Sequence, residues 1–120
     1  MKRGLLLALA TCAAGSALAE PLECSFTTEC YEAEGCHDTD YGFMVWFPSE
    51  TNAQVVTITD QTGDYPGQAE PLGTEGRVIR FVSGFGPSML TLHGTAARLS
   101  AHSGSEAMMV TYAGTCREVE

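Results

Sequence analysis

Basic residues are scarce in this sequence, and no lysine follows position 2. The 120 residues include 6 Lys and Arg against 15 Asp and Glu, a formal net charge of -9 at pH 7. A protein that binds nucleic acid needs a Lys- and Arg-rich surface to neutralise phosphates. We therefore exclude nucleic acid as a partner. The hydrophobic fraction of 44% indicates a chain with a core, which also excludes disorder.

Long apolar runs and helical periodicity are also missing. The apolar run over residues 4–14 has about half of the roughly 20 residues that a membrane-spanning helix needs. No segment repeats its apolar residues with the 3.6-residue period of an amphipathic helix. We expect no transmembrane segment and little helix.

Catalytic motifs are absent as well. The sequence contains no Gly-x-Ser-x-Gly, no His-Glu-x-x-His, no phosphate loop and no Cys-x-x-Cys. Its histidines, His37, His93 and His102, do not converge on one predicted centre. We expect no catalytic residues, no cofactor and no enzymatic activity.

The N-terminus resembles a secretory signal peptide. Lys2 and Arg3 precede the apolar run, and the Ala17-Leu18-Ala19 triplet is a small-residue cleavage signal. Cleavage after residue 19 leaves residues 20–120, which we expect to be a single β-domain in the periplasm or secreted. A competing hypothesis is a lipoprotein acylated at Cys12. With residues 1–19 removed, four of the six basic residues remain against all fifteen acidic ones, so the net charge becomes -11.

Four cysteines remain after this cleavage, which indicates two disulfides in an exported chain. They are Cys24, Cys30, Cys36 and Cys116. Alternating apolar residues over 22–30 predict a strand with one buried face, along which Cys24 and Cys30 are about 20 Å apart and cannot bond. We favour Cys24–Cys116 with Cys30–Cys36, because residues 31–35 then form a compact loop. The alternative is Cys30–Cys116 with Cys24–Cys36.

The rest of the chain consists of short runs rich in β-branched and aromatic residues, separated by Gly, Pro, Asn and Asp. Candidate strands cover residues 41–47, 54–59, 78–82, 88–93, 96–102 and 107–115. Turn signals between them include Pro66-Gly67 and Gly94-Thr95. We predict an all-β fold, a small antiparallel sandwich or barrel of about 6–8 strands tied by two disulfides.

The last three candidate strands predict their own register. It follows from a two-residue turn at 94–95 and a second turn over residues 103–106. The predicted facing pairs are Leu92–Ala97, Leu90–Leu99, Leu99–Val110 and Ala97–Tyr112. All of these pairs are apolar, which supports the alignment.

Residues 41–47 carry apolar side chains on both faces. Phe43 and Val45 alternate with Met44 and Trp46. We expect a central strand that is buried on both sides. The alternative is an exposed aromatic patch that binds a partner.

Two groups of side chains are candidate metal ligands. The predicted register places Met89, Ser100 and Met109 in one outer row with His102 on the diagonal, and two thioethers with an imidazole suit Cu(I). Near Cys36, an expected loop carries four carboxylates whose oxygens suit Ca²⁺, although the spacing of an EF-hand is absent. These are Glu32, Glu34, Asp38 and Asp40. A solvated acidic loop is the other interpretation.

Two segments carry a resemblance to known proteins. The stretch Cys24-Ser25-Phe26-Thr27-Thr28-Glu29-Cys30 and the tail Thr111-Tyr112-Ala113-Gly114-Thr115-Cys116 resemble a group of small, mostly uncharacterised exported proteins of Gram-negative bacteria. This resemblance implies a periplasmic β-protein without a defined activity. The expected architecture is also similar to that of the periplasmic inhibitors of C-type lysozyme. Their inhibitory loop contains a Ser-x-Ser-Gly-x-x-Tyr-like segment, and residues 94–99, the nearest equivalent, lack the tyrosine.

The function that we expect is a non-catalytic periplasmic binding or interaction domain for a protein or small ligand. An acidic surface attracts cationic partners, and lysozymes are basic, so binding or inhibition of such a partner is the first hypothesis. Solubility alone also explains an acidic surface. The second hypothesis is a periplasmic metal-binding protein that uses one of the two ligand groups above.

Overall fold

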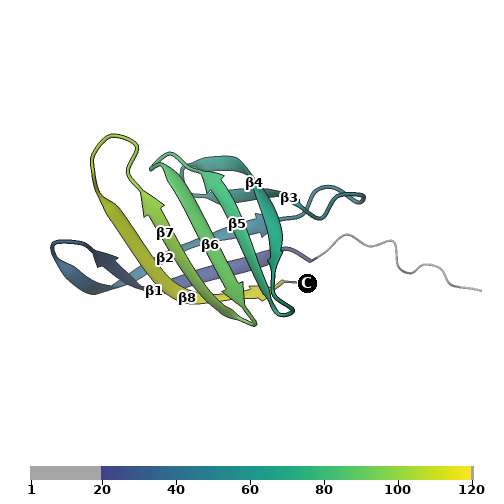
Figure 1. Ribbon diagram of the computed structural model, residues 1–120, viewed down its shortest axis with the longest axis horizontal. Helices are drawn as coiled ribbons and strands as arrows, with labels where there is room; N and C mark the ends of the chain where they lie inside the picture. The colour runs from purple at the N-terminus through teal and green to yellow at the C-terminus, as the bar shows by residue number, and fades with distance from the viewer. Residues whose placement is uncertain (1–19, 120) are drawn as a thin grey trace, which may run out of the picture.

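The computed structural model describes residues 20–119, which form eight antiparallel strands closed into a barrel (Figure 1). The strands are β1 (Leu22–Tyr31), β2 (Gly35–Trp46), β3 (Val55–Asp60), β4 (Gly63–Leu72), β5 (Gly76–Val82), β6 (Pro87–His93), β7 (Ala96–His102) and β8 (Met109–Glu118). The prediction of an antiparallel all-β fold is confirmed, and of the two architectures considered the barrel is the one found. No helix within residues 20–119 is long and apolar enough to cross a membrane. The predicted signal peptide and the Cys12 alternative lie outside the described residues.

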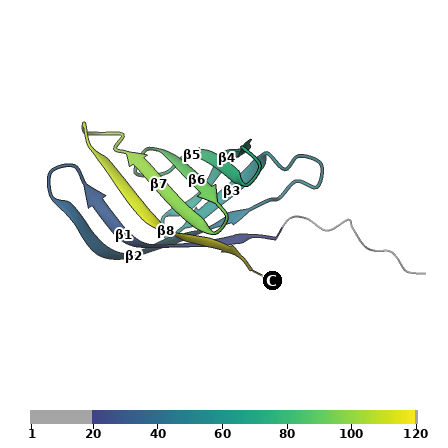
Figure 2. The ribbon, with the colours of Figure 1, turned by 60° about the horizontal axis from the view of Figure 1, so that its bottom comes forward.

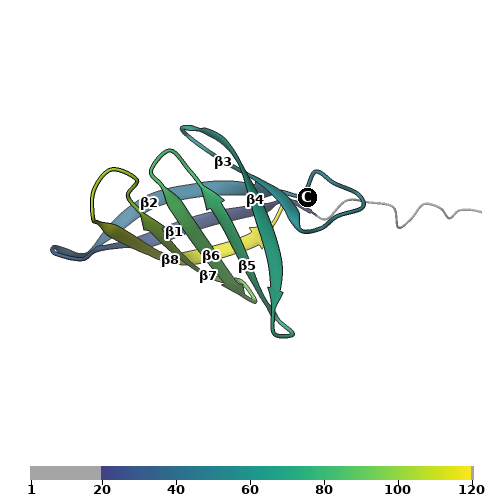
Figure 3. The ribbon, with the colours of Figure 1, turned by 45° about the horizontal axis from the view of Figure 1, so that its top comes forward.

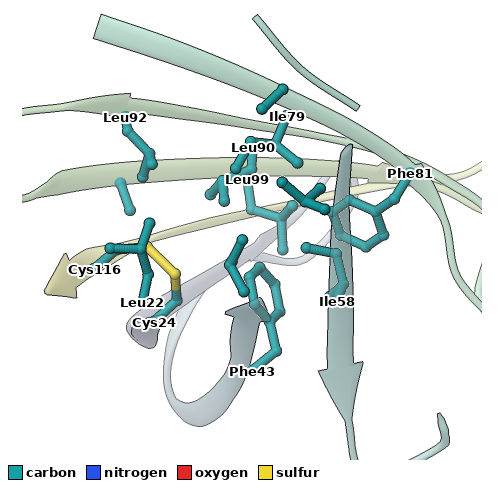
Figure 4. Close-up of a cluster of buried hydrophobic side chains, with 14 of the residues drawn as sticks. Leu22, Cys24, Phe43, Ile58, Ile79, Phe81, Leu90, Leu92, Leu99 and Cys116 are labelled. Carbon is teal, nitrogen blue, oxygen red and sulfur yellow. A yellow bond between two sulfur atoms is a disulfide. The ribbon is translucent and has the colours of Figure 1, made fainter. Parts of the chain in front are cut away.

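Apolar side chains that alternate along the strands fill the barrel. In β6 and β7, every second residue is buried, as expected when one face of each strand lines a core. Figure 4 shows Ile58, Ile79, Leu90 and Leu99 converging from four different strands. An eight-stranded barrel has an interior just wide enough for packed side chains or one small ligand. Since the centre is packed, any ligand cavity inside the barrel has to lie toward an end.

The barrel closes between the first and the last strand, and a disulfide lies at this seam. Cys24 of β1 is directly opposite Cys116 of β8, and the two residues are bonded with a Cα separation of 4.0 Å (Figure 4). The predicted Cys24–Cys116 bond is confirmed. The bond links residues 92 positions apart, and loop-closure entropy assigns a loop of this length about 4 to 5 kcal/mol of stabilisation.

The second predicted disulfide, Cys30–Cys36, is also confirmed, and it joins directly opposite residues of the β1–β2 hairpin. The connection spans only residues 32–34, which is shorter than the expected loop. Gly35 follows with φ of 81°, a conformation that glycine adopts readily. The expectation that Asp38 and Asp40 lie on a loop is wrong, because the hairpin continues as regular sheet almost to its tip and both residues belong to β2.

A β-bulge interrupts β1. The register with both neighbouring strands shifts between Phe26 and Thr28. Across this point β1 has one residue more than β8, and β2 has one residue more than β1. Gly114 of β8 lies against this point. A Cβ atom at position 114 would be 2.6 Å from the Cα atom of Phe26, so the close approach of the two backbones requires glycine.

Beyond the bulge, each side chain of β1 faces the side of the sheet opposite to the one that regular alternation would give it. Before it, Phe26 faces the interior. Beyond it, Glu29 pairs directly with Tyr112, which packs against the core. Because directly opposite residues share a face of the sheet, Glu29 also faces inward and Cys30 faces outward. The prediction of one uninterrupted buried face over residues 22–30 is therefore wrong.

The predicted register of β6 and β7 is confirmed, with Leu90 opposite Leu99 and a turn at residues 94–95. The predicted register of β7 and β8 is wrong by two residues. Tyr112, in place of Val110, lies opposite Leu99. The reason is the length of the β7–β8 loop, which covers residues 103–108 and is closed by a hydrogen bond from the Ser103 N–H to the Met108 carbonyl. A shift of two keeps every side chain on its predicted face.

β4 was not expected, because Pro66-Gly67 was interpreted as a turn. In the structure, Pro66 lies before the first residue of β4 that pairs with β5, and Pro71 lies after the last residue that pairs with β3. Each proline therefore has a neighbouring strand on one side only, and its missing N–H can face the open side. The expectation that residues 41–47 are buried on both faces is also wrong. Trp46 is 42% exposed, because the outer face of the barrel is uncovered there.

Candidate functional site

One end of the barrel is strongly acidic. Because consecutive strands run up and down, the connections 32–34, 61–62, 83–86 and 103–108 all lie at this end, which we call the mouth (Figure 1). The acidic residues at or near the mouth are Glu29, Glu32, Glu34, Asp38, Asp40, Asp60, Asp64 and Glu106. Of the arginines in residues 20–119, Arg77 and Arg117 line a groove at the opposite end, and Arg80 and Arg98 lie within strands. Among the described residues, the mouth therefore carries eight carboxylates and no arginine or lysine.

A cavity of about 190 Å³ opens at the mouth. Tyr41 of β2 and Tyr112 of β8 line one wall, and Asp60 of β3 with Thr62 of the β3–β4 connection lines another. Phe85 of the β5–β6 loop also borders it. The cavity thus combines aromatic rings with a carboxylate, directly above the packed core.

Short hydrogen bonds fix the polar wall of the cavity. The Tyr41 hydroxyl donates to Oδ2 of Asp60 at 3.2 Å. The other carboxylate oxygen accepts from the backbone N–H and the hydroxyl of Thr62, at 2.7 and 2.6 Å. Because the Thr62 hydroxyl donates to Asp60, the Tyr65 hydroxyl 2.6 Å away donates to Thr62. The carboxylate is therefore held in one orientation.

The rings of Tyr41 and Tyr112 form the other wall and pack against the buried ring of Phe26. The centroids of Tyr41 and Tyr112 are 5.0 Å apart, and the Phe26 ring lies about equally far from both, at 6.0 and 5.9 Å. Aromatic pairs at such distances are stabilising beyond the area that they bury. The ring pair has an acidic residue on either side, with Asp60 beside Tyr41 and Glu29 opposite Tyr112.

The environment keeps the tyrosine hydroxyls protonated. Burial, then the charge and hydrogen bond of Asp60, raise the pKa of Tyr41 far above its ordinary value. Burial and the neighbouring Glu29 carboxylate raise the pKa of Tyr112 in the same way. The pKa of Tyr31, at the end of β1, is raised by burial and by Glu29 as well. These hydroxyls remain donors at any physiological pH.

Asp60, in contrast, stays ionised. Burial alone would raise its pKa, but hydrogen bonds from Thr62, from the Tyr41 hydroxyl and from the Gly63 backbone outweigh burial and lower it. The cavity therefore presents a fixed negative charge beside neutral aromatic hydroxyls.

The loops at the mouth are tied to one another. The Gly104 N–H donates to the Phe85 carbonyl at 2.9 Å, which joins the β7–β8 loop to the β5–β6 loop. Within the latter loop, the Ser83 N–H donates to the Gly86 carbonyl and the Phe85 N–H donates to the Ser83 hydroxyl. The shape of the cavity is therefore largely preformed, which lowers the entropic cost of binding.

The structure brings the candidate Cu(I) ligands near one another, in an arrangement that differs from the prediction. His102 pairs directly with Met109 across β7 and β8, whereas Ser100 faces Thr111. Met89 pairs with Ser100 and lines the same outer groove as His102, a groove of about 620 Å³. The predicted single row is wrong because the longer β7–β8 loop shifts β8 by two residues. Within residues 20–119, no three His, Cys, Asp or Glu side chains gather as a metal site would require.

The tyrosines and Asp60 were not predicted as a site from the sequence. Tyr41, Asp60 and Tyr112 come from β2, β3 and β8, and Tyr112 reaches Tyr41 only because β8 closes on β1. Thr62-Gly63-Asp64 is typical of a turn, but a turn signal does not indicate which distant strand lies opposite. The histidines are dispersed: His93 is at the end opposite the mouth, while His37 and His102 lie on β2 and β7.

Comparison with known proteins gives no assignment. The chain matches no family model, no curated protein and no solved structure. The geometry and charge of the mouth are therefore the basis for the functional interpretation.

Proposed function

We propose that the protein is an exported, non-catalytic binding domain whose mouth takes up a cationic group of a protein or small ligand. The observation that carries this proposal is the tyrosine-lined cavity among eight carboxylates, with no arginine among the described residues at that end. The two disulfides support export, because such bonds form and persist in oxidising compartments.

The charge distribution favours a cation for a physical reason. Carboxylates that share one end of a small domain repel one another, and a bound ammonium or guanidinium group relieves that repulsion. The combined field also steers cationic molecules toward the mouth and raises their association rate. Solubility alone would not require the arginines to be confined to the rest of the barrel.

The cavity itself adds specific contacts. A cation attracts the face of an aromatic ring, with a contribution of about 0.5 to 2 kcal/mol depending on desolvation. Tyr41 and Tyr112 present such rings between the carboxylates of Asp60 and Glu29. An alkylammonium or guanidinium group placed over the rings would meet negative charge on both sides.

Calorimetric titration with a C-type lysozyme as cationic probe, at low and high salt, tests the proposal. The double variant Glu29→Gln/Asp60→Asn should weaken binding at low salt about tenfold, because each lost charge is worth about 0.5 to 1 kcal/mol. The matched control Glu50→Gln/Glu118→Gln removes two exposed charges at the other end and should change affinity about twofold at most. Equal losses in both variants, or no binding, would contradict a role for the mouth. An activity assay on the same mixture separates binding from inhibition. Full lysozyme activity would reject inhibition of the enzyme but would leave binding to it unaffected.

A second candidate function is Cu(I) binding on the outer face of the barrel. It is favoured by the direct pairing of His102 with Met109, and by Met89, which is 42% exposed and lines the same groove as His102. Thioether and imidazole ligands suit Cu(I). Titration with Cu(I) should show one bound ion, and Met109→Leu should weaken the affinity at least tenfold. An unchanged affinity in this variant would remove the candidate.

A further inference from the structure

β2 has an edge without a neighbouring strand. It pairs with β1 along most of its length, but with β3 only at Met44, Val45 and Trp46. Within the described part of the chain, no strand pairs with the other side of residues 35–42, which we call the free edge. Figures 2 and 3 show β2 continuing with β1 toward the hairpin while β3 diverges from it. The backbone N–H and C=O groups along this edge are available to another chain.

The free edge is held in an extended conformation. Cys30–Cys36 joins β1 and β2 near the hairpin tip, and β1 is supported on its other side by β8 as far as Tyr31. The free edge therefore already has the conformation that strand pairing requires, without a bound partner. A preformed edge avoids much of the ordering cost of binding.

Side chains on the free edge alternate in character. Asp38 and Asp40 are exposed, while Thr39 and Tyr41 are half-buried and continue the inward-facing side of the strand. An added strand would lie about 4.8 Å away, and its side chains would meet those of β2 position by position. Lys or Arg at every second residue would then lie beside the two aspartates, with the intervening side chains near Thr39 and Tyr41.

Asp38 and Asp40 make a second copy of this chain an unfavourable partner for the free edge. Two free edges paired with each other would place acidic side chains of both copies on one small sheet, and like charges on neighbouring strands are destabilising. Charged residues on an edge strand commonly prevent such self-association. A basic partner removes this repulsion.

We infer that the free edge accepts an extended segment of a basic partner as an additional strand, with a Lys or Arg at every second residue. The inference rests on the proposed function, since both require a cationic partner. It adds a mode of recognition, in which backbone hydrogen bonds provide affinity and the alternating charges provide selectivity.

The test uses a capped peptide of alternating Lys and Thr, as long as the free edge, and the same peptide N-methylated at every residue. The two peptides carry equal charge, but only the first can form backbone hydrogen bonds. The first peptide should bind at least tenfold more tightly, and hydrogen exchange of alternate amides in residues 35–42 should slow at least tenfold. Asp38→Asn/Asp40→Asn should weaken binding about tenfold, whereas Asp64→Asn/Glu106→Gln, which changes two mouth charges away from the edge, should have a smaller effect.

The outcomes separate this inference from the proposed function. If both peptides bind equally and exchange at residues 35–42 is unchanged, strand addition is wrong while recognition of cations stands. Absence of binding by either peptide also overturns strand addition, and the lysozyme titration then decides the proposed function independently. Slower exchange confined to residues outside 35–42 would place the peptide elsewhere and contradict the inference.

Discussion

The Tyr41 hydroxyl donates a hydrogen bond to Asp60 just beyond the point where β2 and β3 stop pairing. The last backbone pair toward the mouth is Met44 with Thr59, and the 3.2 Å side-chain bond lies on the open side of that pair. It therefore joins β3 to β2 where the backbone ladder no longer does. The same bond helps to orient a carboxylate of the candidate site, so one contact both links β2 to β3 near the mouth and contributes to the site geometry.

Replacing Tyr41 with Phe should loosen this junction. The hydroxyl is lost while the ring contacts with Phe26 and Tyr112 remain. We expect the free energy of unfolding to fall by about 1.5 to 3 kcal/mol, the usual contribution of a hydrogen bond to a charged group. The pKa of Asp60 should rise, because one of the bonds that lower it is gone. Urea denaturation and an NMR titration of the carboxyl measure the two effects.

The control for this change is Tyr65→Phe. The Tyr65 hydroxyl reaches Thr62 and leaves the bond between Tyr41 and Asp60 in place. It should move the pKa of Asp60 less than Tyr41→Phe does. Equal pKa changes in the two variants would mean that the direct bond has no special role.

Stability should decrease in acid partly through Asp60. Burial opposes ionisation of this group, but its hydrogen bonds lower the folded-state pKa below the ordinary value of 3.8. The unfolded chain therefore takes up the proton more readily, and the contribution of Asp60 to stability is complete above pH 3.8 and lost as the pH falls through the folded-state pKa. Denaturation curves at several pH values should show a smaller acid-induced loss in Asp60→Asn than in the natural protein. Parallel pH profiles for the two proteins would show that Asp60 does not contribute.

The two disulfides should differ in their contribution to stability. Cys24–Cys116 encloses a loop with a sequence separation of 92, and Cys30–Cys36 one of 6. Loop-closure entropy then assigns about 4.7 kcal/mol to the first and about 2.4 kcal/mol to the second. Paired Cys→Ala variants compared by urea denaturation should follow this order. A larger loss on removal of Cys30–Cys36 would show that local hairpin structure outweighs chain entropy.

The sequence was informative where structure is local. Alternation and the turn at 94–95 predict the β6–β7 register correctly. The compact loop over residues 31–35 favours Cys30–Cys36, which leaves Cys24 to pair with Cys116. The wrong predictions concern features that depend on pairing with neighbouring strands. These are the proline positions in β4, the length of the β7–β8 loop and the bulge in β1. The site depends on these same features. Glu29 faces Tyr112 because of the bulge, and alternation alone predicts the opposite face for Glu29.

Gly114 offers a test of the bulge and of the site together. A Cβ atom at this position would be 2.6 Å from the Cα of Phe26 and would also contact the Ser25 carbonyl, so Gly114→Ala has to push β1 and β8 apart. We expect the free energy of unfolding to fall by about 2 kcal/mol or more, because forcing extra atoms into a packed region typically costs about 1 to 3 kcal/mol. The NMR signals of Glu29 and Tyr112 should shift as their pairing is disturbed. Gly104→Ala is the control, since the nearest atom to a Cβ there is 3.6 Å away and the loss should stay below about 0.5 kcal/mol. If Gly114→Ala is as stable as this control, the bulge is not held by the close approach of the two strands.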